Sequence, residues 1–408
     1  MIASLSDGHL QDPPSAYADP LGYVLGTAPN LASTDELARA VTQNVLRALL
    51  VGFLHEPPLA YWYRNAFRVE GKSLAFHEVL ARLLPRLNGT TTAECTMFAK
   101  APAPVDFAEW VTAFYRLCRR VLPPAAAPEV EGPTPQAQLS CRLPVAVRRL
   151  AGELGERRGL SLYLHGSLAT CDATAYSDVD TLLFVANEWL DNAKHANELR
   201  RLVSRAQRWL YAYDPLQHHG FMVVTELDLS RYARCYYPLE LLSHAYVLSG
   251  TRDLRYRVRS SHEEQVSLLR RMAARLEEME TGECRPPVTR YALKAVLSEM
   301  MLVPTYFLQA TQRVVYKRDS FSMVEPFLSA RARESMRMLT EWRLAWKRGP
   351  WERAYRSLNV LATTQIRQRV LAHARGASID EGDQRRWCAV LPGARAMTAD
   401  LLRQLNPQ

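Results

Sequence analysis

Residues 160–185 constrain the fold of this chain more than any other stretch. An apolar run of strand length, residues 160–164, stops at a Gly-Ser step at residues 166–167. After a short spacer, an Asp-Val-Asp sequence at residues 178–180 leads into a second apolar run. The pattern predicts two strands, with a tight glycine turn after the first and paired acids at the start of the second.

These residue types in this order suit phosphate and metal chemistry. Gly166 has no Cβ and Ser167 has a small hydroxyl, so the backbone there can approach a ligand closely. A helix that begins at this step would offer free N–H groups to an anion. Side chains alternate along a strand, so Asp178 and Asp180 share one face. Two carboxylates on one face repel each other unless a cation lies between them, and Mg²⁺ is the usual choice.

The arrangement closely resembles the signature of the DNA polymerase β-like nucleotidyltransferase superfamily, and residues 177–180 resemble its minimal and antibiotic nucleotidyltransferase branches. The resemblance implies transfer of a nucleoside monophosphate from a nucleoside triphosphate, with ATP expected, to an acceptor hydroxyl with release of pyrophosphate. It implies that Asp178 and Asp180 hold two Mg²⁺ ions and that Gly166 and Ser167 hold the β and γ phosphates.

The chain departs from this pattern at the third carboxylate, which the superfamily supplies from the strand beside the paired acids. The expected strand, residues 220–225, is preceded by His218 and His219 and by no acid. Glu226 and Asp228 lie at its far end, roughly 20 Å from its start. A histidine here would act as a metal ligand, as a hydrogen-bond partner of the acceptor, or as a general base; the alternative is one packed and one exposed histidine.

A second, looser similarity concerns the triphosphate. Lysine is rare in this chain, yet Lys294 and Lys317 fall in one helical segment, and Ser320 follows. This resembles the part of the superfamily's helical domain that grips the triphosphate. The alternative is that both are solvated helix lysines and that the serine is an N-cap.

The whole chain is expected to be α+β, with a small mixed-sheet nucleotidyltransferase catalytic domain between two all-α regions. The expected divisions are an all-α region of unknown role (1–122), a Pro- and Ala-rich linker (123–140), the catalytic domain (141–236) and a helical C-terminal domain (237–408). Helices are predicted over residues 33–54, 73–84, 105–121, 143–158, 187–213, 238–248, 261–280, 287–312, 321–347 and 351–374.

Composition bears on location. The seven cysteines include no Cys-x-x-Cys pair, which favours reduced thiols in a cytosol. We see no secretory signal at the N-terminus, and the apolar run at residues 45–54 is interrupted by Arg47. These features predict a cytoplasmic protein without a membrane span.

Charge bears on the acceptor. The net charge of +9 and the arginine-rich C-terminal helices favour RNA, although a general arginine bias would produce the same excess. The arginines concerned are Arg331, Arg333, Arg337, Arg343, Arg348, Arg353 and Arg356. An aromatic cluster at residues 60–65 suits base stacking or helix packing. The alternatives to RNA are a small-molecule (antibiotic) acceptor, a protein acceptor, or a pseudoenzyme that binds nucleotide without turnover.

Overall fold

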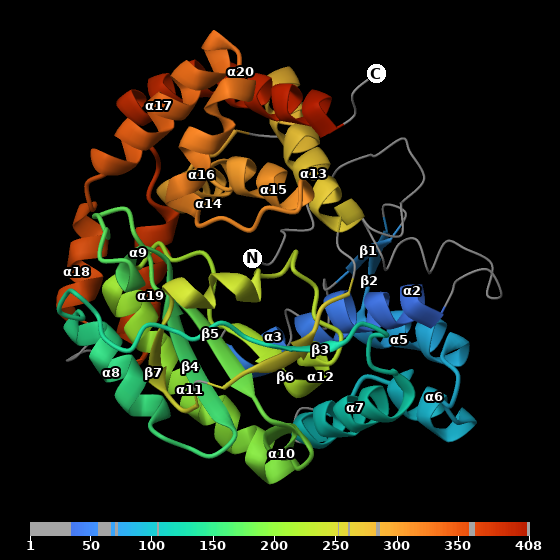
Figure 1. The fold of residues 1–408 in the computed structure, drawn as a ribbon. Coiled ribbons are helices and arrows are strands. Elements are labelled where there is room, and N and C mark those ends of the chain that lie inside the picture. Colours follow the sequence, from blue (N-terminus) through green and yellow to red (C-terminus); the bar gives the residue numbers. More distant parts are fainter. Residues whose placement is uncertain are drawn as a thin grey trace.

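A computed structural model describes residues 34–55, 67–69, 72–103, 106–251, 253–259, 262–282, 286–358 and 364–405. The aromatic cluster at residues 60–65 lies outside the described residues. The chain is a mixed α+β protein in which a small sheet lies between N-terminal and C-terminal helices (Figure 1).

The central sheet has four strands in the order β6-β5-β4-β7. Their bounds are Leu160–His165 for β4, Asp180–Val185 for β5, Met222–Thr225 for β6 and Tyr246–Ser249 for β7. Strand β4 pairs antiparallel with both β5 and β7, and β5 pairs parallel with β6. The three predicted strands are confirmed, and the sheet is mixed as expected.

The fourth strand corrects the prediction of a helix over residues 238–248. Only a 3₁₀ turn, η4 (Leu239–His244), forms there, and the chain then extends into β7 along the edge of β4. Tyr246 and Val247 have high strand propensity, and an open edge of a sheet overrides the helical pattern that precedes them. The central sheet therefore extends beyond residue 236, the expected end of its domain.

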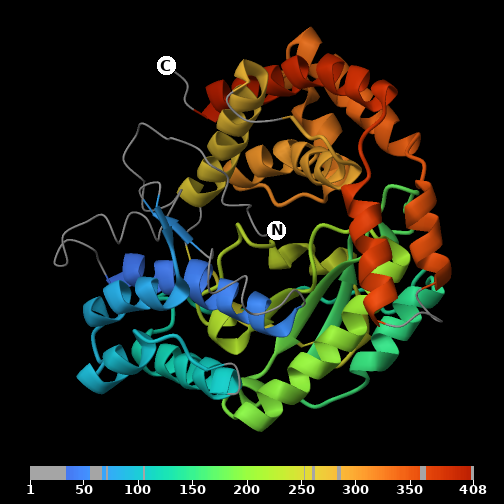
Figure 2. The same cartoon turned by 180° about the vertical axis from the view of Figure 1, so that it is seen from behind.

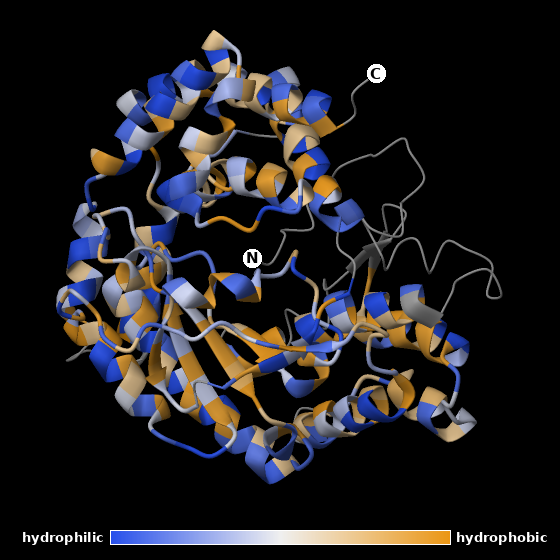
Figure 3. Cartoon of the chain, in the orientation of Figure 1, coloured by the Kyte–Doolittle hydropathy of each residue, from blue (hydrophilic) through white to orange (hydrophobic). Residues whose placement is uncertain are grey.

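Both faces of the sheet are buried, and successive side chains along each strand point to opposite faces. Leu162 and Leu183 belong to a core shared with α8 (Val145–Leu154) and α11 (Ala193–Tyr213). Figure 2 shows α11 lying across this face of the sheet. The opposite face packs under residues that follow β6, and its core consists of Tyr163, Leu182, Phe184, Val224, Tyr232, Leu239, Leu242, Ala245, Leu254 and Tyr256. Figure 3 shows the resulting run of hydrophobic residues along the strands.

The N-terminal helices share the core of the first face. They are α2 (Thr34–Arg39), the π-helix η1 (Ala40–Leu46), α3 (Arg47–Leu54), α5 (Phe76–Leu83), α6 (Thr92–Phe98) and α7 (Phe107–Val121). The helices predicted over residues 33–54 and 105–121 are confirmed within the described residues. The helix predicted over residues 73–84 begins only at Phe76, because residues 73 and 74 belong to a two-stranded hairpin, β1 (Phe67–Val69) and β2 (Lys72–Leu74), which also corrects the expectation of an all-α region. By length and composition the run Glu36–Leu54 would also suit a membrane span, and 78% of it is buried inside the protein.

The segment expected to be a linker is fixed to the sheet region. Strand β3 (Glu129–Glu131) pairs antiparallel with β8 (Arg255–Arg257), and Gln136 forms a parallel bridge with Tyr246. The proline-rich stretch forms no helix, but it is paired with other strands and is not a free linker.

The C-terminal helices form a second core of their own. They are α13 (His262–Thr281), α14 (Arg290–Met300), α15 (Val303–Ala310), α16 (Lys317–Val324), α17 (Ala330–Leu344), α18 (Pro350–Leu358), α19 (Thr364–Gly376) and α20 (Glu381–Leu405). Tyr176 and Leu216 come from the loops at the end of the sheet and insert into this core. The sheet region and the C-terminal helices are therefore packed together at the strand ends that carry the paired aspartates.

The prediction that the cysteines are all reduced is wrong. Cys141 and Cys171 form a disulfide with their Cα atoms 5.7 Å apart, although 30 residues separate them in sequence. The fold brings the segment before α8 against the loop that follows the Gly-Ser turn, and no sequence spacing could indicate this approach. Cys95, Cys118, Cys235 and Cys388 are free thiols.

Candidate functional site

The Gly-Ser turn and the paired aspartates meet at the end of β4 and β5. His165, the last residue of β4, pairs in register with Asp180, the first residue of β5. Gly166 has φ +68°, and a Cβ at this position would overlap the carboxylate of Asp180. Only glycine combines this backbone conformation with such a close approach, so the turn and the carboxylate fit each other. A short helix, α9 (Gly166–Ala169), begins at this step as expected.

Both predicted histidines lie against the aspartates. Nε2 of His219 is 3.3 Å from Oδ2 of Asp178 and 3.1 Å from Oδ1 of Asp180. Nδ1 of His218 is 3.6 Å from the same Oδ2 of Asp178. The structure therefore brings together all four residues that the sequence indicated, and His219 bridges the two carboxylates.

The electrostatics of this group follow from that bridge. Burial alone would lower the pKa of His219, but hydrogen bonds and charge from Asp178 and Asp180 outweigh it and raise the pKa to about 10. The pKa of Asp178 is held well below its usual value, against the effect of burial, by the charges of Lys294 and His219. At neutral pH the two carboxylates share the imidazolium of His219, which supplies between them the positive charge that a metal ion would otherwise supply.

Two further histidines nearby are neutral. Burial lowers the pKa of His218 to about 3 and that of His165 to about 4. His165 is 8% exposed, its ring centroid lies 4.6 Å from that of Tyr237, and its Nε2 has no hydrogen-bond partner among the described residues. The site thus contains the carboxylate oxygens of Asp178 and Asp180 together with the uncharged imidazoles of His165 and His218.

The histidine loop, residues 214–221 between α11 and β6, carries His218 and His219, and Gln217 fixes it from one side. Oε1 of Gln217 accepts a hydrogen bond from Val179 N (3.2 Å), and its Nε2 donates to Val179 O (3.0 Å). Gln217 is completely buried, and Val179 lies between the two aspartates. This paired contact sets the register of His218 and His219 against Asp178 and Asp180.

Both helical regions hold the same loop. From α19, Arg375 donates to the carbonyl oxygens of Pro215 (3.3 Å) and Gln217 (3.2 Å). From the N-terminal side, Nε2 of His55 accepts a hydrogen bond from Phe221 N (2.9 Å). The position of the histidines therefore depends on residues from all three parts of the chain.

Two residues expected to contact a triphosphate have partners inside the protein instead. Lys294 is 1% exposed and forms an ion pair with Asp214 in the histidine loop. Ser320 is fully buried and its Oγ donates to the carbonyl oxygen of Lys317 (2.7 Å). Lys294 thus affects the site in two ways, because its charge lowers the pKa of Asp178 and its ion pair holds Asp214. Ser320 stabilises the first turn of α16.

Lys317 is placed differently. It is half-buried at the start of α16, and its ammonium forms no ion pair with any carboxylate among the described residues. Burial and the charge of Arg343 lower its pKa, while the charges of Asp180 and Asp178 act in the opposite direction. Tyr316 directly precedes Lys317, and its hydroxyl lies 3.1 Å from that of Thr170, which connects the start of α16 to the segment after the Gly-Ser turn.

Sequence reasoning missed the supporting residues His55, Asp214 and Gln217. Gln217 directly precedes the two histidines, which was the only available signal. Glu226 and Asp228 follow Thr225, which pairs with Val185 at the opposite end of β5 from Asp180, so both acids lie away from the site as expected. Oδ2 of Asp228 accepts hydrogen bonds from the backbone N–H and hydroxyl of Thr225, both at 2.8 Å.

No protein-family model matches this chain, and no curated protein matches it either.

Proposed function

We propose that the chain is a metal-dependent nucleotidyltransferase that transfers a nucleoside monophosphate from a nucleoside triphosphate, with ATP expected, to an acceptor hydroxyl and releases pyrophosphate. One observation carries the proposal. The carboxylate of Asp180 packs against the Gly166 turn at the end of two paired strands, and the single imidazolium of His219 joins it to the carboxylate of Asp178.

These residues fit a divalent cation. Two carboxylates that hold a protonated His219 between them bind positive charge at this point, and Mg²⁺ is the ion that the resemblance implies. When bound, such ions neutralise phosphate charge and lower the pKa of the acceptor hydroxyl. Asp178 and Asp180 are the residues that would hold them.

The other residues position the substrate. Gly166 leaves the backbone of the turn open beside Asp180, and Ser167 follows it. Lys317 supplies a positive charge on the side of α16 and is our candidate for the contact with the β and γ phosphates. His165 and His218 are neutral imidazoles beside the carboxylates, and burial makes both weak bases at neutral pH, so their role toward the acceptor would be a hydrogen bond to its hydroxyl.

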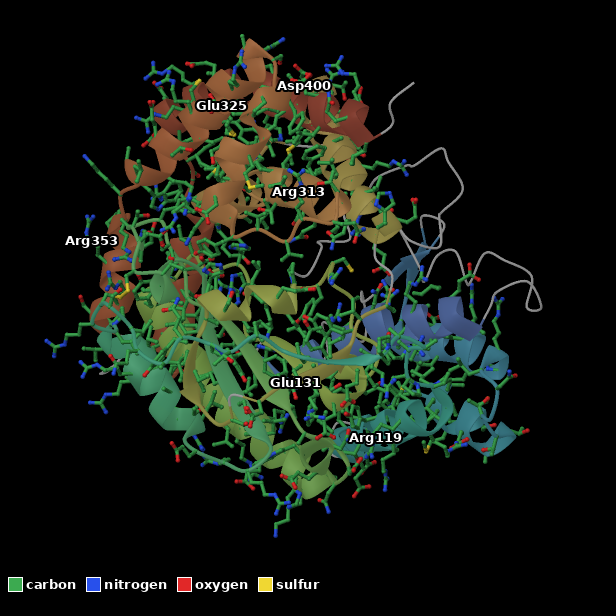
Figure 4. The ribbon with its side chains drawn as sticks, viewed as in Figure 1. Arg119, Glu131, Arg313, Glu325, Arg353 and Asp400 are labelled. Atoms are coloured by element: carbon green, nitrogen blue, oxygen red, sulfur yellow. A yellow bond between two sulfur atoms is a disulfide. The ribbon has the colours of Figure 1, made fainter. Side chains whose placement is uncertain are left out.

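RNA is the acceptor that the charge distribution favours. Several of the C-terminal arginines are exposed, among them Arg331 and Arg333 on α17 and Arg353 and Arg356 on α18; Figure 4 shows Arg353 at the outer edge. Arg337 is instead compensated by Glu334 and Glu341. An extended polyanion uses distributed cations of this kind, whereas a drug-sized acceptor needs only a pocket.

The test is pyrophosphate release with Mg²⁺ or Mn²⁺ across a panel of nucleoside triphosphates and acceptors: bulk tRNA, aminoglycosides and proteins. Turnover should fall by about 10³-fold in the Asp180→Asn variant, because the substitution removes the negative charge of the side chain with little change in its shape. Normal turnover in a folded Asp180→Asn protein would show that the site is misassigned. Nucleotide binding without turnover on every acceptor would favour a pseudoenzyme.

The acceptor class is tested separately by binding to bulk tRNA. Affinity for RNA should fall steeply between low and physiological salt, in proportion to the number of phosphates neutralised. Undetectable or salt-independent binding would reject RNA and leave a small-molecule or protein acceptor.

A further inference from the structure

Asp178, His218 and His219 have the geometry of a metal centre as well as that of a hydrogen-bonded group. One ligand atom from each of the three side chains lies within 4.8 Å of the other two. The two imidazole rings are nearly perpendicular, with centroids 4.9 Å apart, so that they approach the carboxylate from different directions. Oδ2 of Asp178 lies 3.3 Å from Nε2 of His219 and 3.6 Å from Nδ1 of His218. Ligands that lie about 2.0–2.2 Å from one tetrahedral ion are about 3.3–3.6 Å apart, so these atoms can surround one ion.

A second observation concerns His218. Its Nδ1 is buried from solvent and has no hydrogen-bond partner within the part of the chain that the structure describes. It lies 3.6 Å from Oδ2 of Asp178, beyond hydrogen-bond distance. A buried polar atom without a partner is costly, and a cation between this nitrogen and the carboxylate oxygen would satisfy both atoms.

The donor set argues against Mg²⁺ as the ion in this position. Mg²⁺ is a hard cation that takes oxygen ligands and keeps several waters. Imidazole nitrogen favours first-row transition ions, whose affinity for nitrogen ligands also exceeds that of Mg²⁺. A site of two imidazoles and one carboxylate leaves further coordination positions open for substrate oxygens.

We infer that Asp178, His218 and His219 form a binding site for a first-row transition dication, in place of one of the two Mg²⁺ ions that the resemblance implies. Binding of the ion displaces the proton that His219 holds between the two carboxylates in the metal-free protein and releases it to solvent. The inference rests on the proposed function for the role of the site, but binding itself does not depend on turnover. The paired contact between Gln217 and Val179 holds the backbone that leads into His218 and His219 without a metal ion.

The experiment uses Mn²⁺ as the probe on the full chain after chelation. Electron paramagnetic resonance measures the free Mn²⁺ concentration during a titration and detects imidazole ¹⁴N coupled to the bound ion. We expect ¹⁴N coupling in the parent protein, and an affinity for Mn²⁺ at least about 10-fold higher than for competing Mg²⁺. Absence of ¹⁴N coupling, or equal competition by Mg²⁺, would overturn the inference.

Variants assign the ligands. His218→Gln should weaken Mn²⁺ binding by about 10-fold or more and leave coupling from a single imidazole. The matched control is His195→Gln, since His195 is exposed on α11, and it should bind Mn²⁺ as the parent does. If His218→Gln keeps the parent's affinity and coupling, the ligand assignment is wrong. Imidazole-coupled Mn²⁺ in a protein that releases no pyrophosphate would reject the proposed function and leave the metal site intact.

Discussion

Nε2 of His55, at the end of α3, accepts a hydrogen bond from the main-chain N–H of Phe221, at a distance of 2.9 Å. Its Nδ1 lies 3.0 Å from the carbonyl oxygen of Val51, so the ring is held as the tautomer with the proton on Nδ1. Gly220 has no room for a Cβ, which would overlap the same ring. An N-terminal helix thus fixes the loop that carries His218 and His219.

This contact predicts an effect of His55 on both stability and turnover. His55→Leu leaves the buried N–H of Phe221 unsatisfied and should cost about 1–3 kcal/mol in the free energy of unfolding. Turnover should fall as the histidine loop shifts. His55→Gln retains an acceptor and should recover much of both, as measured by urea unfolding and pyrophosphate release. Parent-like values in His55→Leu would show that the contact has no positioning role.

The pH dependence of stability should also depend on His55. Burial lowers its pKa to about 4, from an unfolded value of about 6.5. Between these values the unfolded chain binds a proton that the folded protein does not, so stability falls as the pH falls. Relative to His55→Gln, the parent should lose about 2 kcal/mol between pH 7.5 and pH 5. Identical pH profiles from denaturant unfolding would contradict the neutral state of His55.

Gly166→Ala should separate catalysis from folding. The new methyl group displaces the carboxylate of Asp180, and a shift of about 1 Å at a reacting centre costs about 100-fold in turnover. The positive φ adds about 1–2 kcal/mol of strain. Gly152→Ala on α8 is the matched control, because no atom lies within 4 Å of its Cβ position, and it should be active and slightly more stable. Parent-like turnover in Gly166→Ala would argue against the proposed site.

Lys294 should prove to be mainly a support for the loop. Lys294→Met leaves Asp214 buried without its partner and should cost about 3–5 kcal/mol in the free energy of unfolding. Adding Asp214→Asn removes the uncompensated charge and keeps an acceptor for the N–H of Leu216, so the double variant should regain stability. Additive losses in a thermal-unfolding cycle would show that the two residues are not coupled.

Lys317 should contribute to nucleotide affinity without a comparable effect on stability. Loss of one charge-assisted contact in Lys317→Gln should weaken binding of a nucleoside triphosphate by about 10- to 100-fold in calorimetry. Arg313→Gln is the control, because Arg313 is an exposed cation in the loop after α15 (Figure 4). Equal affinities for Lys317→Gln and the parent would remove Lys317 from the phosphate contact.

The strands and most helices of this chain could be predicted because each rests on local pattern. Residues 160–164 and 180–185 are apolar runs bounded by a glycine turn and by acids, and the structure makes both into strands. The proximity of His218 and His219 to Asp178 followed from the order of the same motifs.

What could not be predicted depends on pairings between distant segments. The ion pair of Lys294 with Asp214 joins residues 80 positions apart, and the disulfide of Cys141 with Cys171 joins two loops. Local periodicity contains no information on such contacts. Tyr246 entered β7 because β4 offered an unpaired edge, which is a tertiary effect.

Strand β7 has a consequence for any attempt to dissect the chain. It covers one edge of β4 and pairs with Leu162, Tyr163 and Leu164, with a shift in register between the first two. A fragment of residues 141–236 would expose the backbone N–H and C=O groups of this apolar strand. Such an edge is a template for intermolecular strand addition, so the fragment should self-associate. Adding residues 237–259 restores the protecting strand, although the helices at either end still supply the contacts that hold the histidine loop.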